Sequence, residues 1–399
     1  MKRFYENVVR EHLASHRQMA FLSGPRQVGK TTTARVIAPD FRYYNWDRQE
    51  DRRLVLQGAD AIARDLDLQN LGPSRKLAVF DEIHRYPKWK SFLKGFFDGY
   101  GEQCHLLVTG RARLNVYKRG GDSLMGRYFP YRMHPLSIAE LIDPSVPPQP
   151  LRQPRAIEGK IMEQLLRFGG FPEPFLKASE RFHRRWSDLR TEMLFREDIR
   201  DGTRIHEAGQ IQVLAELLAS RAGQLVNYSS LAAEVNVAVD TIRRWVAVLE
   251  AFFHVFAIRP WHRNVAKSLR KQPKIYLRDW SALRDPGARL ENFVACHLLK
   301  AAEGWTDLGF GNFELFYLRD KMQREVDFLI ARDKKPWFLV EVKSAARKEI
   351  SPALVHFQAQ TGAPHAFQVA GDLGFVHQDC FSMKKPARAP LATLLSQLL

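Results

Sequence analysis

Residues 24–32 read GPRQVGKTT and follow residues 20–23 (AFLS), an apolar stretch that is typical of a buried strand. The spacing GxxxxGK[ST] predicts a phosphate-binding loop between this strand and a helix. Small residues let the backbone wrap around phosphate, with its N–H groups pointing inward. We expect Lys30 to place a positive charge on the β- and γ-phosphates of ATP, and Thr31 to offer a hydroxyl to Mg²⁺. The predicted ATP-binding residues are Gly24, Pro25, Arg26, Gln27, Val28, Gly29, Lys30, Thr31 and Thr32.

Two further apolar runs end in residues that suit hydrolysis of a bound nucleotide. Residues 77–82 (LAVFDE) predict a strand ending at Asp81, which would hold Mg²⁺ through water, and at Glu82, which would polarise the attacking water. An isolated match of this kind would indicate only a solvated acidic turn. Residues 105–110 (HLLVTG) predict a third strand, and Thr109 at its end would sense the γ-phosphate or orient water. A threonine at the end of a strand is, however, common in any protein.

The bulk composition favours a soluble protein that meets polyanions. The chain has 399 residues, is 45% hydrophobic and carries a formal net charge of +17, which indicates association with nucleic acid unless the charge only solvates the surface. Three scattered cysteines form no CxxC pair, which argues against a cysteine-built zinc site or a disulfide framework. No signal peptide is recognisable, and no apolar run approaches the roughly 20 residues of a membrane span. We therefore expect a cytoplasmic protein with no membrane partner.

Several segments together resemble the AAA+ superfamily. The segments GPRQVGKTT, VFDEIHRYPKW, LLVTGRARL, LMGRYFPYRMHPLSIAEL and GGFPEPFL are similar to a bacterial and archaeal family that joins an AAA-type ATPase to a C-terminal domain of formally unknown function. This resemblance implies that Arg127 is an arginine finger for a neighbouring subunit, with Arg132 as the substitute, and that the chain forms a homo-oligomer, expected to be a hexamer. An arginine paired with a surface carboxylate is the alternative. The chain departs from the family at Thr109-Gly110-Arg111, where such proteins usually read TGS.

Residues 225–258 predict a helix, a turn, a second helix and a strand, a pattern that resembles a winged helix-turn-helix. Ser229 or Ser230 would cap the first helix, and Val239-Asp240 would begin the second. A basic hairpin would follow, with Trp261 and His262 at its root. The alternative is a helix-turn-helix that only packs against protein. The predicted core residues are Leu231, Val235, Ile242, Val246 and Leu249, and the predicted DNA-binding residues are Arg243, Arg244, Arg263, Lys267, Arg270 and Lys271.

The C-terminal region resembles a PD-(D/E)xK nuclease core. Glu291 lies on a predicted helix and Asp327 on a predicted strand, whereas Glu341 and Lys343 lie two apart on the next strand and so share a face. Asp327 and Glu341 would hold a second Mg²⁺ or Mn²⁺, and Lys343 would steady the attacking water. Gln358 would support this site from the following helix. The alternative is that this core survives only to bind nucleic acid or to support the fold.

The sequence therefore predicts an α/β protein with four parts: an AAA+ P-loop ATPase domain with a parallel sheet (1–150), a helical lid or linker (151–210), a winged helix-turn-helix (211–285) and a PD-(D/E)xK-like α/β domain (286–399). The first boundary lies at the proline-rich residues 143–154. The leading hypothesis is an ATP-hydrolysing motor that binds DNA, including branched, Holliday-junction-like DNA, in recombination, repair or mobile-element processing. The alternatives are a nucleotide-gated signalling or defence switch and an ATP-regulated, structure-selective nuclease.

Overall fold

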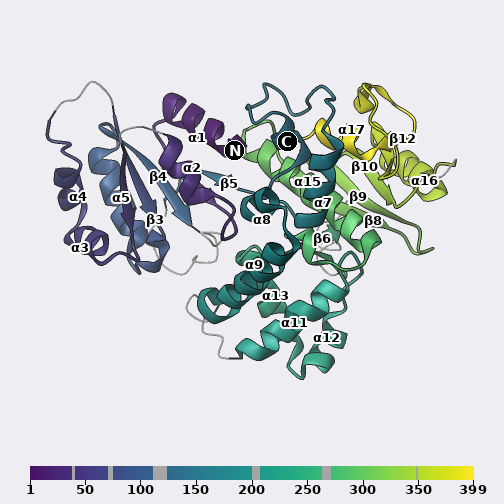
Figure 1. Cartoon of the computed structure of the whole chain (residues 1–399), viewed down its shortest axis with the longest axis horizontal. Coiled ribbons are helices and arrows are strands. Elements are labelled where there is room, and N and C mark those ends of the chain that lie inside the picture. The colour runs from purple at the N-terminus through teal and green to yellow at the C-terminus, as the bar shows by residue number, and fades with distance from the viewer. Residues whose placement is uncertain (38–40, 71–74, 111–123, 200–206, 263–270, 347–348) are drawn as a thin grey trace. The chain divides into compact units, whose positions relative to one another are not determined.

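The computed structural model describes residues 1–37, 41–70, 75–110, 124–199, 207–262, 271–346 and 349–399 (Figure 1). These residues form two compact units. Unit 1 comprises Met1–His134, Pro144–Val146 and Ala251–Phe253, and unit 2 comprises Pro135–Asp143, Pro147–Glu250 and His254–Leu399. The predicted positions Arg111, Arg263, Lys267 and Arg270 lie outside the described residues.

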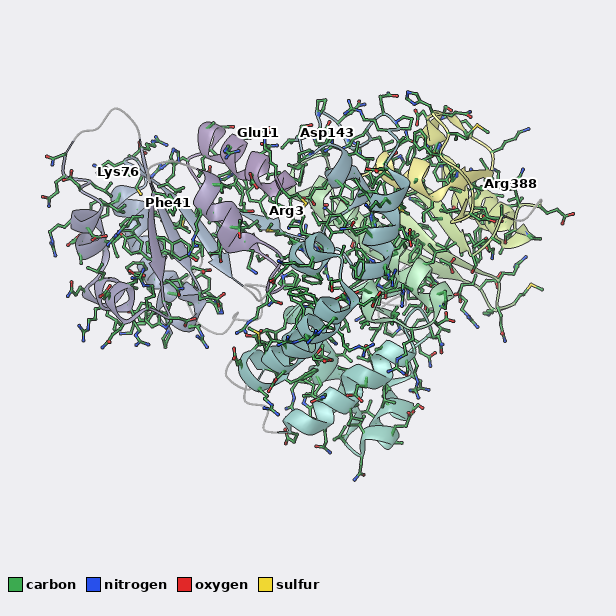
Figure 2. The ribbon with its side chains drawn as sticks, in the orientation of Figure 1. Arg3, Glu11, Phe41, Lys76, Asp143 and Arg388 are labelled. Atoms are coloured by element: carbon green, nitrogen blue, oxygen red, sulfur yellow. The ribbon has the colours of Figure 1, made fainter. Side chains whose placement is uncertain are left out.

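Unit 1 is built on a five-stranded parallel sheet in the order β2-β3-β4-β1-β5. The predicted strands around the phosphate-binding loop, the acidic pair and Thr109 are all present, and the predicted α/β class is confirmed. Figure 2 labels Phe41 and Lys76, which begin the neighbouring strands β2 and β3. The strands are β1 (Met19–Ser23), β2 (Phe41–Asn45), β3 (Lys76–Asp81), β4 (Cys104–Gly110) and β5 (Tyr128–Arg132).

Alternating side chains of this sheet supply two apolar faces, as expected of buried parallel strands. Phe21 and Phe80 pack with Leu93 and Phe96 in one continuous cluster under α3, α4 and α5. Ala20 and Leu22 point to the other face, which α1 and α2 cover (Figure 1). The helices of unit 1 are α1 (Phe4–Ser15), α2 (Lys30–Ile37), α3 (Gln49–Gln57), α4 (Ala59–Asp65), the 3₁₀ turn η1 (Ile83–Arg85) and α5 (Trp89–Tyr100).

Unit 2 contains a seven-stranded mixed sheet in the order β12-β11-β10-β9-β8-β6-β7. The pairs β6/β7, β8/β9 and β9/β10 are antiparallel, and the other pairs are parallel. The strands are β6 (Val255–Pro260), β7 (Lys274–Leu277), β8 (Phe313–Arg319), β9 (Glu325–Arg332), β10 (Lys335–Lys343), β11 (His365–Ala370) and β12 (Ala387–Pro390).

Helices of unit 2 lie before, between and after these strands. None of the helices in the described ranges has both the length and the apolar character that a membrane span needs. The helical elements are α6 (Ile138–Ile142), α7 (Gly159–Phe168), α8 (Pro172–Lys177), α9 (Glu180–Met193), η3 (Leu194–Ile199), α11 (Ala208–Ser220), α12 (Tyr228–Val235), α13 (Val239–Ala251), η4 (Trp280–Ala282), α15 (Pro286–Asp307), α16 (Pro352–Thr361), η5 (Cys380–Ser382) and α17 (Leu391–Ser396).

The pair α12 and α13 has the predicted helix–turn–helix order, but its first cap differs from the prediction. Asn227, and neither serine, is the N-cap of α12, because its side-chain oxygen accepts the backbone N–H groups of Ser229 and Ser230. α13 begins at Val239 with Asp240 in its first turn, as expected. The five predicted core residues, Leu231, Val235, Ile242, Val246 and Leu249, are all buried.

The strands β6 and β7 form the hairpin predicted to follow α13, and they do not stand apart from the C-terminal region. Arg259 and Pro260 at the end of β6 pair with Phe316 and Tyr317 of β8, so the hairpin forms one edge of the seven-stranded sheet. The end of β6 is therefore fixed by the same sheet that carries Asp327 and Glu341.

Candidate functional site

The predicted nucleotide-binding residues of unit 1 lie at one edge of the parallel sheet. Ser23, the last residue of β1, is in register with Gly110 of β4, and Asp81, the last residue of β3, is in register with Thr109. The loop after β1 therefore begins where the acidic pair and Thr109 are presented. In open α/β sheets, ligands bind at this carboxyl edge of the strands.

Both glycines of the phosphate-binding loop are constrained, Gly24 by lack of space and Gly29 by its backbone conformation. A side chain at Gly24 would place its Cβ atom 2.4 Å from the Met133 carbonyl oxygen. Gly29 has a φ of 105°, and Gln27 has a φ of 61°, so the chain passes twice through conformations that strain most side chains. This winding is what allows successive N–H groups to surround a phosphate.

Lys30 begins α2, is buried, and is held by the loop itself. Its Nζ atom donates to the carbonyl oxygens of Gly24 at 2.8 Å and Pro25 at 2.6 Å. The first N–H groups of an α-helix lack partners within the helix, which makes the N-terminus of α2 attractive to phosphate. The ammonium and these amides present positive charge from the same short segment.

Arg3, which Figure 2 labels, contacts the loop, although no sequence motif identifies it. Its guanidinium is buried and donates to the carbonyl oxygen of Val28, and through Nη2 to that of His134 at 2.7 Å. The carboxylate of Glu6 accepts the backbone N–H of Arg3 at 2.9 Å. Arg3 thus ties the loop to the segment after β5.

Asp81 accepts side-chain hydrogen bonds from both neighbouring strands, β4 and β2. Thr109 Oγ1 donates to Oδ1 of Asp81 at 2.5 Å, and the hydroxyl of Tyr43 donates to Oδ2. Burial first, and then the charge of Asp81, raise the pKa of Tyr43, so it stays protonated and remains a donor.

Thr31, the second residue of α2, and Asp81, the last residue of β3, are the two residues predicted to hold Mg²⁺. Their oxygen atoms are of the kind that a magnesium ion bound together with nucleotide phosphates prefers. The sequence did not predict a role for Tyr43 in the nucleotide site, because a tyrosine on the edge strand β2 looks like any other half-buried strand residue.

Glu82 lies directly after β3 in the left-handed region, with a φ of 55°, and its backbone N–H donates to the Thr109 carbonyl oxygen at 3.2 Å. Its Oε2 atom lies 3.5 Å from Nε2 of His84. Burial, and then the charge of Arg85, lower the pKa of His84 to about 4, so His84 is neutral at pH 7. The side chain of Glu82 thus lies beside a neutral imidazole.

Arg127 lies directly before β5, at the amino ends of the parallel strands and so opposite the end that carries the phosphate-binding loop. Its carbonyl oxygen accepts the N–H of Met19, the first residue of β1, at 2.8 Å. Its guanidinium forms two parallel hydrogen bonds with Asp98, of 2.8 and 2.9 Å, and these hold the pKa of Asp98 below its usual value. Arg132 instead ends β5, in register with Ser23, beside the start of the phosphate-binding loop.

The described basic residues predicted to contact DNA are exposed on unit 2. Arg243 and Arg244 project from α13, and Arg243 pairs with Asp240 at 3.0 Å. Lys271 contributes to a cleft of about 520 Å³ that neighbours the hairpin. The residues lining the cleft are Trp261, His262, Lys271, Leu318, Arg319, Asp320, Lys321, Phe357, Gln360 and Thr361.

The four nuclease-like residues are brought near one another, but in a different arrangement from the one predicted. Lys343 Nζ lies 2.6 Å from Oε1 of Glu341, and Asp327 Oδ2 accepts the N–H of Val342 at 2.8 Å. Glu291 and Asp327 both approach the ammonium of Lys274, which the sequence hypothesis did not include.

The structure does not support two predictions for this region. Within the described residues, no three histidine, cysteine, aspartate or glutamate side chains form a group that could hold a metal ion, so the second Mg²⁺ or Mn²⁺ site at Asp327 and Glu341 is not supported. Lys274 already occupies the space among the carboxylates. Gln358 does not support the cluster either, because its amide donates to the carbonyl oxygens of Ala363 and Lys384.

Three family models match successive parts of the chain. Residues 16–142 match an AAA domain, residues 159–285 match a domain of unknown function (DUF8612), and residues 286–379 match another domain of unknown function (DUF4143). These matches support an AAA-type ATPase domain followed by a C-terminal domain of unknown function, as the sequence segments predicted.

Two curated relatives span most of the chain. "Uncharacterized protein Rv2008c" of Mycobacterium tuberculosis is 26% identical over 358 residues, which cover 86% of this chain and 74% of the relative. "Uncharacterized protein MJ1544" of Methanocaldococcus jannaschii is 25% identical over 310 residues, which cover 74% of this chain and 67% of the relative.

Among solved structures, similarity is weak. A signal transduction ATPase with numerous domains (STAND) and a tetratricopeptide repeat sensor, from Pyrococcus horikoshii, aligns with 77% of this chain at 11% identity and a TM-score of 0.30. This chain spans about half of that protein, 47% of its length. The Drosophila ORC structure bound to AT-rich DNA and Cdc6 aligns with 73% of this chain and 93% of its own, at 12% identity and a TM-score of 0.21.

Proposed function

We propose that unit 1 binds ATP with Mg²⁺ and hydrolyses it. The observation that carries this proposal is the register of β1, β3 and β4, which gathers the phosphate-binding loop, Asp81, Glu82 and Thr109 at one sheet edge. Thr31 and Asp81 would hold the magnesium ion, Asp81 through water. Lys30 and the amides at the start of α2 would neutralise the β- and γ-phosphates.

For this reaction the protein has to position the attacking water and to stabilise the negative charge on the phosphate oxygens. When bound, MgATP supplies the γ-phosphoryl group and a metal charge that offsets its oxygens. Glu82 would orient a water molecule and draw its proton as the water oxygen bonds to the γ-phosphorus. The bond from that phosphorus to the bridging oxygen of ADP then breaks, and Lys30 would stabilise the negative charge that collects on the phosphate oxygens.

We further propose that unit 2 binds DNA and that its occupancy is coupled to ATP turnover. The support is the exposed Arg243 and Arg244 on α13, together with the cleft that Trp261, Lys271 and Lys321 line. Basic side chains contact phosphates, and an indole offers a surface on which a base can stack. The excess positive charge of the chain favours the same kind of partner.

The finer parts of this proposal follow from the sequence hypothesis. They are four domains at 1–150, 151–210, 211–285 and 286–399, a winged helix-turn-helix in the third, and a nuclease-like core in the fourth. A ring-shaped homo-oligomer would place Arg127 at the ATP site of the next subunit. Branched DNA is the substrate that we would test first, in the context of recombination or repair.

A nucleotide-gated switch is the second candidate, and one observation favours it. Both acidic residues of the ATP site are engaged by protein groups: Asp81 by Tyr43 and Thr109, and Glu82 by the neighbouring His84. A site whose carboxylates must first leave such partners fits slow turnover, in which the bound nucleotide acts as a clock for partner recruitment.

ATP turnover with and without DNA distinguishes the two candidates. We expect four-way junction, duplex or single-stranded DNA to stimulate turnover in the wild type, and the Lys30→Ala variant to show none. The double variant Lys271→Ala/Lys321→Ala should keep basal turnover but lose the stimulation. Its slope of log affinity against log salt should fall by about 2, because each duplex phosphate contact contributes about 0.9.

The matched control is Lys384→Ala/Lys385→Ala, which removes the same charge from exposed lysines that do not line the cleft. It should behave as the wild type. Turnover that no DNA alters, with no DNA binding at low salt, would reject the DNA proposal and favour the switch. Turnover that survives Lys30→Ala would instead reject the ATP site itself.

A further inference from the structure

Lys274 is a buried lysine at the centre of an acidic cluster in unit 2. It is the first residue of β7, and its side chain is only 4% exposed. Its Nζ atom lies 2.6 Å from Oε1 of Glu325, 3.6 Å from Oε1 of Glu291 and 3.7 Å from Oδ1 of Asp327. These carboxylates come from α15 and β9, so one ammonium joins the hairpin to two other elements of the fold.

Other donors already hold the carboxylates in place around the lysine. The hydroxyl of Tyr276 donates to Oε1 of Glu291 at 2.7 Å, and the backbone N–H of Val342 donates to Oδ2 of Asp327 at 2.8 Å. The second oxygen of Glu325 accepts from Arg319 at 2.6 Å. A divalent ion would have to displace several of these donors before it could collect oxygen ligands at about 2.0–2.6 Å.

The charges of the cluster are close to balance without a metal. Its carboxyl groups, on Glu291, Glu325, Asp327 and Glu341, meet the cationic side chains of Lys274, Arg319 and Lys343.

Burial, and then the charge of Glu291, raise the pKa of Asp327 to about 7. Burial alone would lower the pKa of Lys274, but Glu291, Asp327 and Glu325 raise it above its usual value, so the lysine stays charged. A divalent ion added to this group would therefore meet a resident cation rather than an uncompensated acidic site.

We propose that Lys274 is a built-in cation that takes the place of a catalytic metal ion in the nuclease-like core of unit 2. The cluster is a fixed cross-link that anchors β7 to α15 and β9, and it does not cut nucleic acid through a bound divalent metal. The inference rests on the proposed nuclease-like core of unit 2 and does not rest on the proposed ATP hydrolysis.

Removal of the ammonium tests this inference directly, because it leaves the carboxyl groups in excess. The test measures the melting temperature of the full chain, without nucleotide, in Mn²⁺ and in EDTA. We expect equal values for the wild type. Lys274→Ala should melt lower in EDTA, by about 5 °C or more, because it leaves half-buried carboxylates without their cation. Mn²⁺ should restore part of this loss.

Oε2 of Glu341 is buried and has no hydrogen-bond partner among the described residues, so an acceptor is ready for the added ion. The double variant Lys274→Ala/Asp327→Asn should lose the Mn²⁺ response, and the exposed Lys271→Ala should never acquire it. Lys274→Met, which keeps the aliphatic stem, replaces Lys274→Ala if the alanine variant does not fold.

Titration of the wild-type protein with Mn²⁺, followed by the paramagnetic resonance signal of free Mn²⁺, decides the question even if both lysine variants fail to fold. Lack of saturable binding that depends on Asp327 supports the inference. Binding by the wild type that Asp327→Asn abolishes would overturn it, and so would a folded Lys274 variant that shows no response to Mn²⁺.

Discussion

At the scale of single residues, the proposed ATP site depends on side chains that contact the residues of the recognisable motifs. The hydroxyl of Tyr43 donates to Asp81, and Arg3 holds the loop through the Val28 carbonyl. His84 lies next to Glu82, the residue proposed to activate water. These three neighbours set the geometry and charge in which the motif residues would work.

His84 provides a prediction about pH. Its pKa is lowered to about 4 in the folded protein, chiefly by burial, against about 6.5 in an unfolded chain. Its neutral form is therefore favoured by folding. The resulting stabilisation is complete above pH 6.5 and is lost as the pH falls toward 4, by at most about 3 kcal/mol. Calorimetric melting of the wild type and His84→Gln between pH 4.5 and 7.5 would measure this difference.

Turnover should consequently show no ionisation of His84 between pH 6 and 8. The His84→Gln variant serves as the control, since it cannot titrate. A break in kcat near pH 6.5 that is present in the wild type and absent from His84→Gln would contradict the buried, neutral imidazole.

At the scale of elements, the sequence predicted what local patterns encode and missed what depends on tertiary contacts. The strands before GPRQVGKTT, at LAVFDE and at HLLVTG were predictable because each is a short apolar run ending in a polar motif. Their parallel order brings Asp81 and Thr109 together, which the sequence could only suggest. The predicted cap of α12 lay two or three residues too late, because asparagine and serine are both good N-caps.

Tyr43 and Lys274 could not have been found from the sequence. Tyr43 lies on β2, whose neighbour β3 begins about 30 residues later in the chain, and its contact with Asp81 depends on that pairing. Lys274 also meets carboxylates of α15 and β9, with no spacing rule that connects them. The acidic residues of the predicted nuclease-like core therefore suggested a metal ion, whereas the structure places the ammonium of Lys274 beside Glu291 and Asp327.

At the scale of the whole molecule, Arg127 tests whether ATP hydrolysis needs a second subunit. Arg127 lies at the edge of the sheet opposite the phosphate-binding loop and pairs with Asp98, so a catalytic role would have to be in a neighbouring chain. We expect Arg127→Ala to bind ATP normally and to lose kcat by a factor on the order of 10³. Asp98→Asn should keep turnover, because the proposed finger stays intact.

Mixing two inactive variants makes the test specific for action between subunits. Arg127→Ala retains Glu82, and Glu82→Gln retains Arg127, so mixed assemblies should contain complete sites and recover part of the wild-type turnover. A mixture that stays inactive, or an Arg127→Ala variant with normal kcat, would contradict the shared site. Arg132, which ends β5 beside Ser23, would then be the next arginine to change.

The central claim is that the sheet edge formed by β1, β3 and β4 hydrolyses ATP. The most direct test measures phosphate release and ATP affinity in the wild type and in Glu82→Gln. The amide keeps the shape of Glu82 but cannot take a proton from water. We predict that Glu82→Gln binds ATP as the wild type does, while kcat falls by about 10²- to 10⁴-fold. Unchanged phosphate release by Glu82→Gln would contradict the claim.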